Sequence, residues 1–131
     1  MSQTKPKMNY LIDTHVLLWW LTDDKRLNQR VRQILSAKPV WCSVVTLWEI
    51  TVKEQIGKID LPDSFDEVLR GSGFIWMDIT LNHIAELHQL PRLHRDPFDR
   101  LLIAQALNEE LTLITADKQI HQYNVPAIRP D

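Results

Sequence analysis

Five acidic residues could bring their carboxylates into one pocket of the folded chain: Asp13, Glu49, Asp96, Asp99 and Asp117. Carboxylate oxygens are the ligands that Mg²⁺ and Mn²⁺ prefer. Such ions can activate a water, neutralise phosphoryl oxygens and assist a departing alkoxide, which are the needs of phosphodiester hydrolysis. Unpaired carboxylates that share a pocket repel one another, so their convergence implies a cation. The acids therefore predict a divalent-metal site, provided that the fold brings them together.

Short apolar runs alternate with helical patterns along the chain. The predicted strands are residues 10–12, 40–45, 74–79 and 111–115, with a last edge strand at 127–128. The predicted helices are 15–21, 27–35, 46–57, a short one from 64, 80–88 and 97–106, and a short helix or turn follows 117. This alternation predicts βαβ units and a mainly parallel sheet covered on both faces. In such sheets ligands bind beyond the carboxyl ends of the strands, where Asp13, Glu49 and Asp117 are expected.

Each acid also has a purely structural interpretation. Asp96 precedes Pro97 and can cap a helix, and Asp99 can stabilise the first turn through the helix dipole. Asp13 can likewise cap the first helix, and Asp117 can start a turn. Glu49 stands among apolar neighbours, where a solvated glutamate is less expected. The segment 64–67, Ser-Phe-Asp-Glu, is typical of a capping box.

The composition describes an ordinary globular protein of one domain. The chain has 131 residues, 44% hydrophobic and 24% charged, with a net charge of −2 and one cysteine. We expect a single domain over residues 8–131 after a flexible lead-in, 1–7, with no membrane segment, in the cytoplasm. The negative net charge does not favour binding nucleic acid through phosphates alone. A metal ion in an acidic pocket would supply positive charge that meets the phosphate.

Basic residues near the acids are candidates for guiding phosphates. The favoured ones are Lys53, Arg95 and Arg100, and Lys58, Arg92 and Lys118 are further candidates whose alternative is a solvated surface. The five histidines show no HxxxH or HExxH spacing, which argues against a zinc site.

Four segments in order resemble the motifs of PIN domains, most nearly the VapC-like toxins of bacterial toxin–antitoxin pairs. They are residues 11–14 (LIDT), 43–50 (SVVTLWEI), 96–106 (DPFDRLLIAQA) and 113–117 (LITAD). The resemblance runs from about Met8 to Pro130. It implies a Rossmann-like three-layer α/β/α sandwich and an Mg²⁺- or Mn²⁺-dependent endoribonuclease. It also implies a cognate antitoxin and a homodimer.

The same resemblance implies roles for single residues. Asp13, Glu49 and Asp99 match the three main acids of the family, and Asp117 matches the more variable fourth acid. Asp96 belongs to a DPFD variant of the third motif and is a further candidate ligand. Thr14 and Thr115 match positions that support the acids by hydrogen bonding. The chain departs from the common Thr-Arg-Asp form, with Thr-Ala-Asp and no following Phe, which puts the role of the fourth acid in doubt.

The resulting hypothesis is that these acids bind a metal whose water attacks RNA, leaving 5′-phosphate and 3′-hydroxyl ends. One alternative is another acid-cluster α/β domain, a phosphatase or a response-regulator receiver. The phosphatase motif needs a second Asp two residues after the first, where this chain has His15. A receiver would leave Asp96 and Asp99 unexplained. The other alternative is a non-catalytic PIN-like interaction module.

Overall fold

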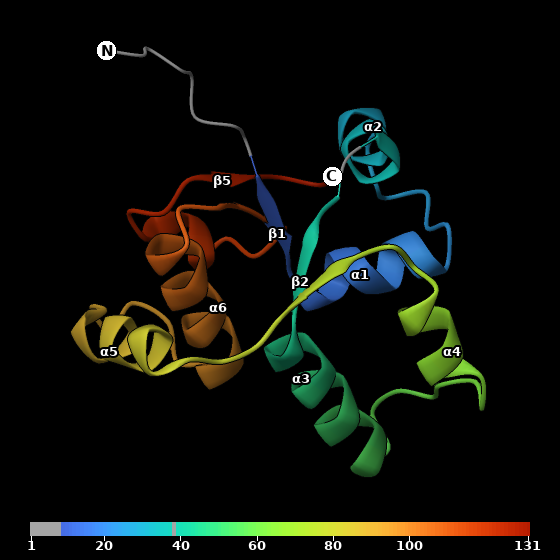
Figure 1. Ribbon diagram of the computed structural model, residues 1–131, viewed down its shortest axis with the longest axis horizontal. Helices are drawn as coiled ribbons and strands as arrows, with labels where there is room; N and C mark the ends of the chain where they lie inside the picture. The colour runs from blue at the N-terminus through green and yellow to red at the C-terminus, as the bar shows by residue number, and fades with distance from the viewer. Residues whose placement is uncertain (1–8, 38) are drawn as a thin grey trace.

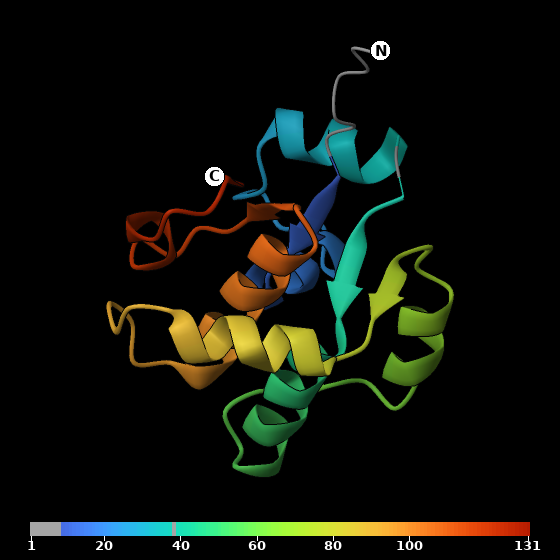
Figure 2. The same cartoon turned by 60° about the vertical axis from the view of Figure 1, so that its left-hand side comes forward.

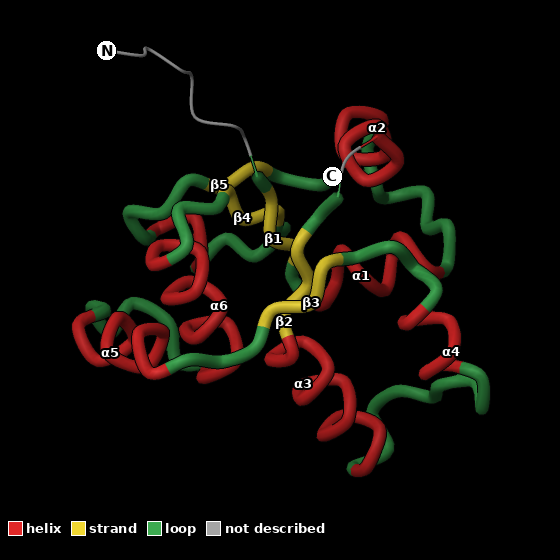
Figure 3. Tube along the Cα trace, viewed as in Figure 1, coloured by secondary structure: helices red, strands yellow, loops and turns green. Residues whose placement is uncertain are grey.

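The computed structural model of the chain describes residues 9–37 and 39–131. The lead-in predicted for residues 1–7 lies outside the described residues. A single sheet runs through the centre of the molecule (Figure 3), and its strands are all parallel in the order β3-β2-β1-β4-β5. The strands are β1 (Tyr10–Ile12), β2 (Trp41–Ser43), β3 (Ile75–Met77), β4 (Thr112–Ile114) and β5 (Ala127–Ile128). The predicted mainly parallel α/β fold is confirmed.

Helices cover the sheet on both sides (Figures 1 and 2). They are α1 (Thr14–Leu21), α2 (Gln29–Ala37), α3 (Val44–Gln55), α4 (Phe65–Arg70), α5 (Leu81–Gln89), α6 (Pro97–Asn108) and the 3₁₀ helix η1 (Ile120–Gln122). None of these helices of the described residues is long and apolar enough to cross a membrane.

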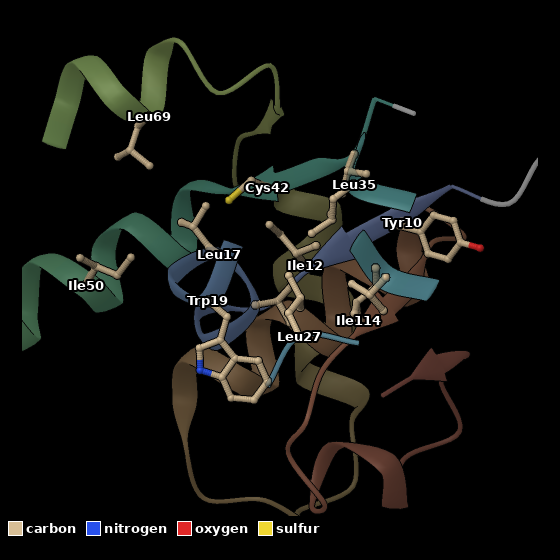
Figure 4. Packing of buried hydrophobic residues seen from close by; sticks show 13 residues of the cluster. Tyr10, Ile12, Leu17, Trp19, Leu27, Leu35, Cys42, Ile50, Leu69 and Ile114 are labelled. Atoms are coloured by element: carbon tan, nitrogen blue, oxygen red, sulfur yellow. The ribbon is translucent and has the colours of Figure 1, made fainter. Parts of the chain in front are cut away.

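Alternating side chains of the central strand bind the two helical layers to the sheet. Tyr10 and Ile12 pack in one core cluster with α1, α2 and α4 (Figure 4). Leu11, between them, points into a second cluster with α6 and η1. Side chains of a strand alternate between its faces, so a strand buried on both sides is apolar throughout. This explains why the strand before Asp13 is an unbroken apolar run, and why Asp13 comes where that run leaves the sheet.

The second predicted strand is too long at its C-terminal end. It was expected to span 40–45, with a helix from Thr46, but β2 ends at Ser43 and α3 begins at Val44. The hydroxyl of Ser43 caps α3 by accepting from the backbone N–H of Val45 at 3.0 Å. This cap outweighs the β preference of the two valines that follow. The third and fourth strands are also shorter than predicted, because only their central residues pair within the sheet.

The capping box predicted at Ser64 is wrong. Ser64 stands at the N-cap of α4 with ψ 9° and makes no side-chain cap hydrogen bond. An N-cap side chain reaches the first turn from an extended backbone, and here a turn from Pro62 to Phe65 holds the residue bent. A capping box is present at α5 instead. The hydroxyl of Thr80 accepts from the backbone N–H of His83, and the Nδ1 atom of His83 accepts from the backbone N–H of Thr80. Sequence reasoning missed it because histidine is not the usual partner.

Candidate metal centre

Asp13 lies at the carboxyl end of the central strand, beside the switch point where the strand order reverses. It caps α1: one oxygen accepts from the backbone N–H of Val16 at 3.0 Å. The other oxygen accepts from the hydroxyl of Thr115, which follows the neighbouring strand β4. The side chain is buried, with 3% of the residue exposed. Burial raises the pKa of Asp13, against the opposing effect of these two hydrogen bonds.

Glu49 reaches the same place from the buried face of α3, which also carries Thr46 and Ile50. One of its oxygens accepts from the hydroxyl of Thr14 at 2.6 Å, and the other accepts from the ammonium group of Lys53 at 2.6 Å. Burial lowers the pKa of Lys53, but its bond to Glu49 and the nearby acids outweigh burial, so the pKa is raised. The structure therefore places Thr14, Glu49 and Lys53 together, as the sequence predicts.

Asp99 and Asp117 meet around the imidazole of His94. Its Nε2 atom lies 2.9 Å from an oxygen of Asp99 and 3.2 Å from an oxygen of Asp117. One ligand atom from each of the three residues lies within 4.8 Å of the others, the spacing of a site that could hold a metal ion. Burial tends to raise the pKa of Asp117, but the backbone N–H of Gln119 and the His94 ring outweigh it and lower the pKa.

Asp13 and Glu49 lie outside the group of described residues whose ligand atoms are within 4.8 Å of one another, which holds His94, Asp99 and Asp117. Asp13 is joined to that group through Thr115, whose hydroxyl donates to Asp13 and accepts from the backbone N–H of Asp117. Burial raises the pKa of Asp99 to about 8, and the next contributions come from the charges of other acids. These acids, in order of effect, are Asp96, Glu49, Asp117 and Asp13. The fold therefore gathers side chains from α1, α3, α6 and the segment after β4 at one edge of the sheet. The N-termini of α1 and α6 also point there, and their dipoles favour negative charge.

Asp96 is a helix cap in this structure. Its Oδ1 atom accepts from the backbone N–H groups of Phe98 at 2.8 Å and Asp99 at 3.2 Å, and Pro97 is the first residue of α6. These contacts are those of a helix cap, the structural role that the sequence offers for Asp96. Its charge still adds to the cluster through Asp99.

Two variants of Asp96 separate capping from metal binding. Asp96→Asn keeps the cap, so we expect little change in stability, whereas Asp96→Ala should lower the free energy of unfolding by about 1 kcal/mol. Asp96→Asn should also weaken Mn²⁺ binding much less than Asp99→Asn does. Chemical denaturation and calorimetric titration with Mn²⁺ measure both quantities. Equal losses of Mn²⁺ affinity in the two Asn variants would show that Asp96 is a ligand.

His94 is the site residue that sequence reasoning missed. Its Nδ1 atom accepts the backbone N–H of Asp96 at 3.3 Å, and an N–H group can only donate, so the ring proton lies on Nε2. Nε2 therefore donates to the carboxylates of Asp99 and Asp117. The imidazole thus ties the two acids together. The signal available was its place two residues before Asp96.

The side chain of Tyr123 holds the loop that carries His94. The hydroxyl of Tyr123 accepts the backbone N–H groups of Leu93 at 3.1 Å and His94 at 2.9 Å, and it donates to the carbonyl of Pro91 at 2.9 Å. Tyr123 is buried in the core cluster beneath α6. The ring of His94 is thus held in position from its own backbone, from Asp96 and from both acids.

The contacts of His94 predict that a donor, and not a ring, is needed at this position. His94→Gln retains an N–H that can reach the acids, whereas His94→Leu does not. We expect His94→Leu to weaken Mn²⁺ binding by roughly 10–100-fold, the usual cost of losing a residue that orients a ligand, and His94→Gln to recover most of it. Calorimetric titration tests this, with His88→Gln, an exposed residue of α5, as the control. Equal losses in both His94 variants would contradict the prediction.

Two of the predicted substrate residues do not join the acids. Arg100 donates from Nη2 to the carbonyl of Leu90 at 3.3 Å, and Arg95 is exposed. Both line a separate pocket with His94 and Arg92. Lys53 alone of the favoured basic residues contacts an acid of the cluster.

The chain matches known proteins over nearly its whole length. The PIN domain family matches residues 10–126, whereas no curated protein matches the chain significantly. Among solved structures, the chain resembles VapBC2 from Rickettsia felis bound to promoter DNA, with 15% identity, a TM-score of 0.73, and coverage of 95% of this chain and 100% of that one.

Two further solved structures show the same likeness. DNA-bound VapBC from Salmonella typhimurium has 17% identity, a TM-score of 0.71, and coverage of 95% of this chain and 99% of that one. A toxin–antitoxin complex from Klebsiella pneumoniae has 19% identity, a TM-score of 0.66, and coverage of 94% and 98%. At these identities the structures show a shared fold, while the family match shows descent: the chain belongs to the PIN domain family.

Proposed function

We propose that this PIN domain is a divalent-metal-dependent endoribonuclease, the toxin of a type II toxin–antitoxin pair. The observation that carries the proposal is the convergence of acids at one edge of the sheet, where Asp13 and Glu49 are buried and ligand atoms of Asp99 and Asp117 lie within 4.8 Å of each other. So much negative charge in one buried pocket is costly unless a cation shares it. A structural role for each acid alone would not require their convergence.

The donor set fits Mg²⁺ or Mn²⁺. Asp13, Glu49, Asp99 and Asp117 offer carboxylate oxygens, the ligands of hard divalent ions. When bound, such an ion supplies charge neutralisation for the phosphate and an activated water. Thr14 and Thr115 hold Glu49 and Asp13 in fixed orientations through their hydroxyls.

Lys53 brings a positive charge to the mouth of this cluster. Its side chain is 33% exposed, whereas that of Glu49, with which it pairs, is 4% exposed. We assign it to contact with a substrate phosphate, since an ammonium group at the exposed side of a buried acid can reach both. Hydrolysis by a water at this site needs no covalent intermediate with the protein.

The assignment as a toxin is supported by the solved structures that share the fold. Those structures are of toxin–antitoxin complexes. We propose that a protein encoded beside this chain binds and inhibits it. We also propose that the chain forms a homodimer, in keeping with the exposed apolar residues Leu81 and Ile84 at the start of α5. Failure of every neighbour-encoded protein to bind it would reject the toxin assignment and leave the nuclease.

The nuclease activity can be tested directly with purified protein. We expect single-stranded RNA to be cut with Mn²⁺ or Mg²⁺, to products with 5′-phosphate and 3′-hydroxyl ends, and to remain intact with EDTA. Zinc, which suits nitrogen and sulfur ligands, should not replace these ions. Mass spectrometry of the products identifies the ends. Absence of metal-dependent cutting of every RNA tried would support the non-catalytic module instead.

A further inference from the structure

Arginines surround an open pocket beside the acid cluster. A cavity of about 380 Å³ is lined by Arg92, His94, Arg95 and Arg100. Arg92 and Arg95 are exposed in the loop between α5 and α6, whereas Arg100 is partly buried near the start of α6. His94 borders this cavity, and its ring also contacts Asp99. The arginine pocket and the acid cluster are therefore neighbours, separated by one imidazole.

The arginines of this pocket lack the aspartate partners that four of the five other arginines of the chain have within the described residues. Four arginines elsewhere each pair with an aspartate: Arg26, Arg32, Arg70 and Arg129. Within residues 9–37 and 39–131, Arg92, Arg95 and Arg100 form no ion pair. The Nε atom of Arg100 is buried with no hydrogen-bond partner there. The chain, whose net charge is −2, thus leaves three guanidinium groups uncompensated around one pocket.

Such a pocket is suited to a phosphate. Guanidinium groups that share a cavity repel one another, and an anion between them removes that repulsion. Their planar N–H groups match phosphate oxygens in paired hydrogen bonds, which ammonium groups cannot do in the same geometry. A carboxylate fits this pocket less well, because a phosphate offers more acceptor oxygens to the three arginines that line it.

We infer that the arginine pocket binds a backbone phosphate of the RNA strand, next to the phosphate that lies at the acids. This inference rests on the proposed nuclease function. RNA carries a phosphate at every nucleotide, so a strand that places one at the acid cluster presents others along its length. The pocket then fixes the strand without reading its bases. The pocket also supplies local positive charge to a chain whose net charge is −2.

The test measures RNA binding in a background that does not cut. In the Asp13→Asn protein, a single-stranded RNA of twelve nucleotides is titrated at several NaCl concentrations. The variants are Arg92→Gln, Arg95→Gln and their double variant, with Arg100→Lys, which keeps the charge of the packed residue. Arg30→Gln is the matched control, because Arg30 is exposed and lies on α2, at the opposite face of the sheet from α6 (Figure 1).

Each phosphate contact contributes about 0.7 to the salt slope of single-strand binding, which is about fivefold in affinity at 0.1 M NaCl. Because the two arginines hold one phosphate, we expect the double variant to lose about fivefold in affinity and about 0.7 of the slope. Arg30→Gln should change both far less. Arg100→Lys should keep the slope, because it keeps the charge, but it should lower the affinity, because an ammonium group cannot form the paired hydrogen bonds of a guanidinium group. In the cutting protein, the same substitutions should raise KM, while the Mn²⁺ affinity stays the same.

Unchanged RNA affinity and slope in the double variant would overturn the inference, even if the protein cuts RNA. Loss of antitoxin binding with unchanged RNA binding would also overturn it, and would assign the pocket to an acidic protein segment. If the variants lose RNA binding as expected but the wild-type protein never cuts RNA, the pocket stands and the nuclease function fails. The two claims therefore fail separately.

Discussion

Asp13→Asn is expected to abolish metal-dependent RNA cleavage and leave the fold intact. Asparagine is as good an N-cap as aspartate, so the bond from the N–H of Val16 survives. The change removes the carboxylate charge of Asp13 and replaces the oxygen that accepts from Thr115 with an amide donor, so the loss should exceed the roughly 10–100-fold that follows from disturbing a residue that only orients a ligand. It also removes one of several repelling charges, so the metal-free variant should be at least as stable as the wild-type protein.

Cleavage rates and thermal unfolding with and without Mn²⁺ measure these effects together. Wild-type protein should gain thermal stability on adding Mn²⁺, because a ligand that binds only the folded state stabilises it. The variant should show little gain. Asp63→Asn, in an exposed loop, is the control and should behave as wild type. Cleavage at the wild-type rate by folded Asp13→Asn would remove Asp13 from the site.

Metal binding should become tighter as pH rises towards 8. Below its pKa of about 8, Asp99 holds a proton in the metal-free protein, and a metal must displace it. One released proton gives about a tenfold gain in affinity per pH unit, and the gain should level off above pH 8. The metal-free protein should show the opposite trend in stability. The folded pKa lies above the unfolded value of 3.8, so stability falls as pH rises from about 4 to 8.

Calorimetric titration with Mn²⁺ in buffers of different ionisation enthalpy counts the protons released. We expect a release that declines to zero above pH 8 and a smaller release in Asp99→Asn, with denaturation of the metal-free protein giving the stability trend. A metal affinity independent of pH between 6 and 8 would contradict the raised pKa. The Asp63→Asn protein again serves as the control for a general effect of lost charge.

Much of the fold follows from local sequence signals. The strand before Asp13 is an unbroken apolar run because both of its faces are covered. Gly57 was expected to end the helix of Glu49, and it lies just beyond α3 with a φ of 77°, a conformation that glycine adopts freely. The ends of the strands were less predictable. The cap at Ser43 decides where β2 ends, and the intrinsic preferences of the residues that follow do not reveal this cap.

The positions of the acids were predictable because topology brings the carboxyl ends of parallel strands to one edge. The contacts between their side chains were not. His94 contacts both Asp99 and Asp117, the latter 23 residues further along the chain, and its place depends on a loop held by Tyr123. Asp96 could be a cap or a ligand from sequence alone, because both roles use the same carboxylate at a helix start. In the structure its Oδ1 atom caps α6, and the comparison of Asp96→Asn with Asp99→Asn tests whether it also binds the metal.

The central claim is that Asp13, Glu49 and Asp99 share one cation. A crystal soaked in Mn²⁺, with data collected at the manganese absorption edge, tests it most directly. We expect an anomalous peak within coordination distance, about 2.0–2.6 Å for hard divalent ions, of carboxylate oxygens from these three residues. A peak held by other residues, or an Mn²⁺-saturated protein with no peak among these acids, would contradict it.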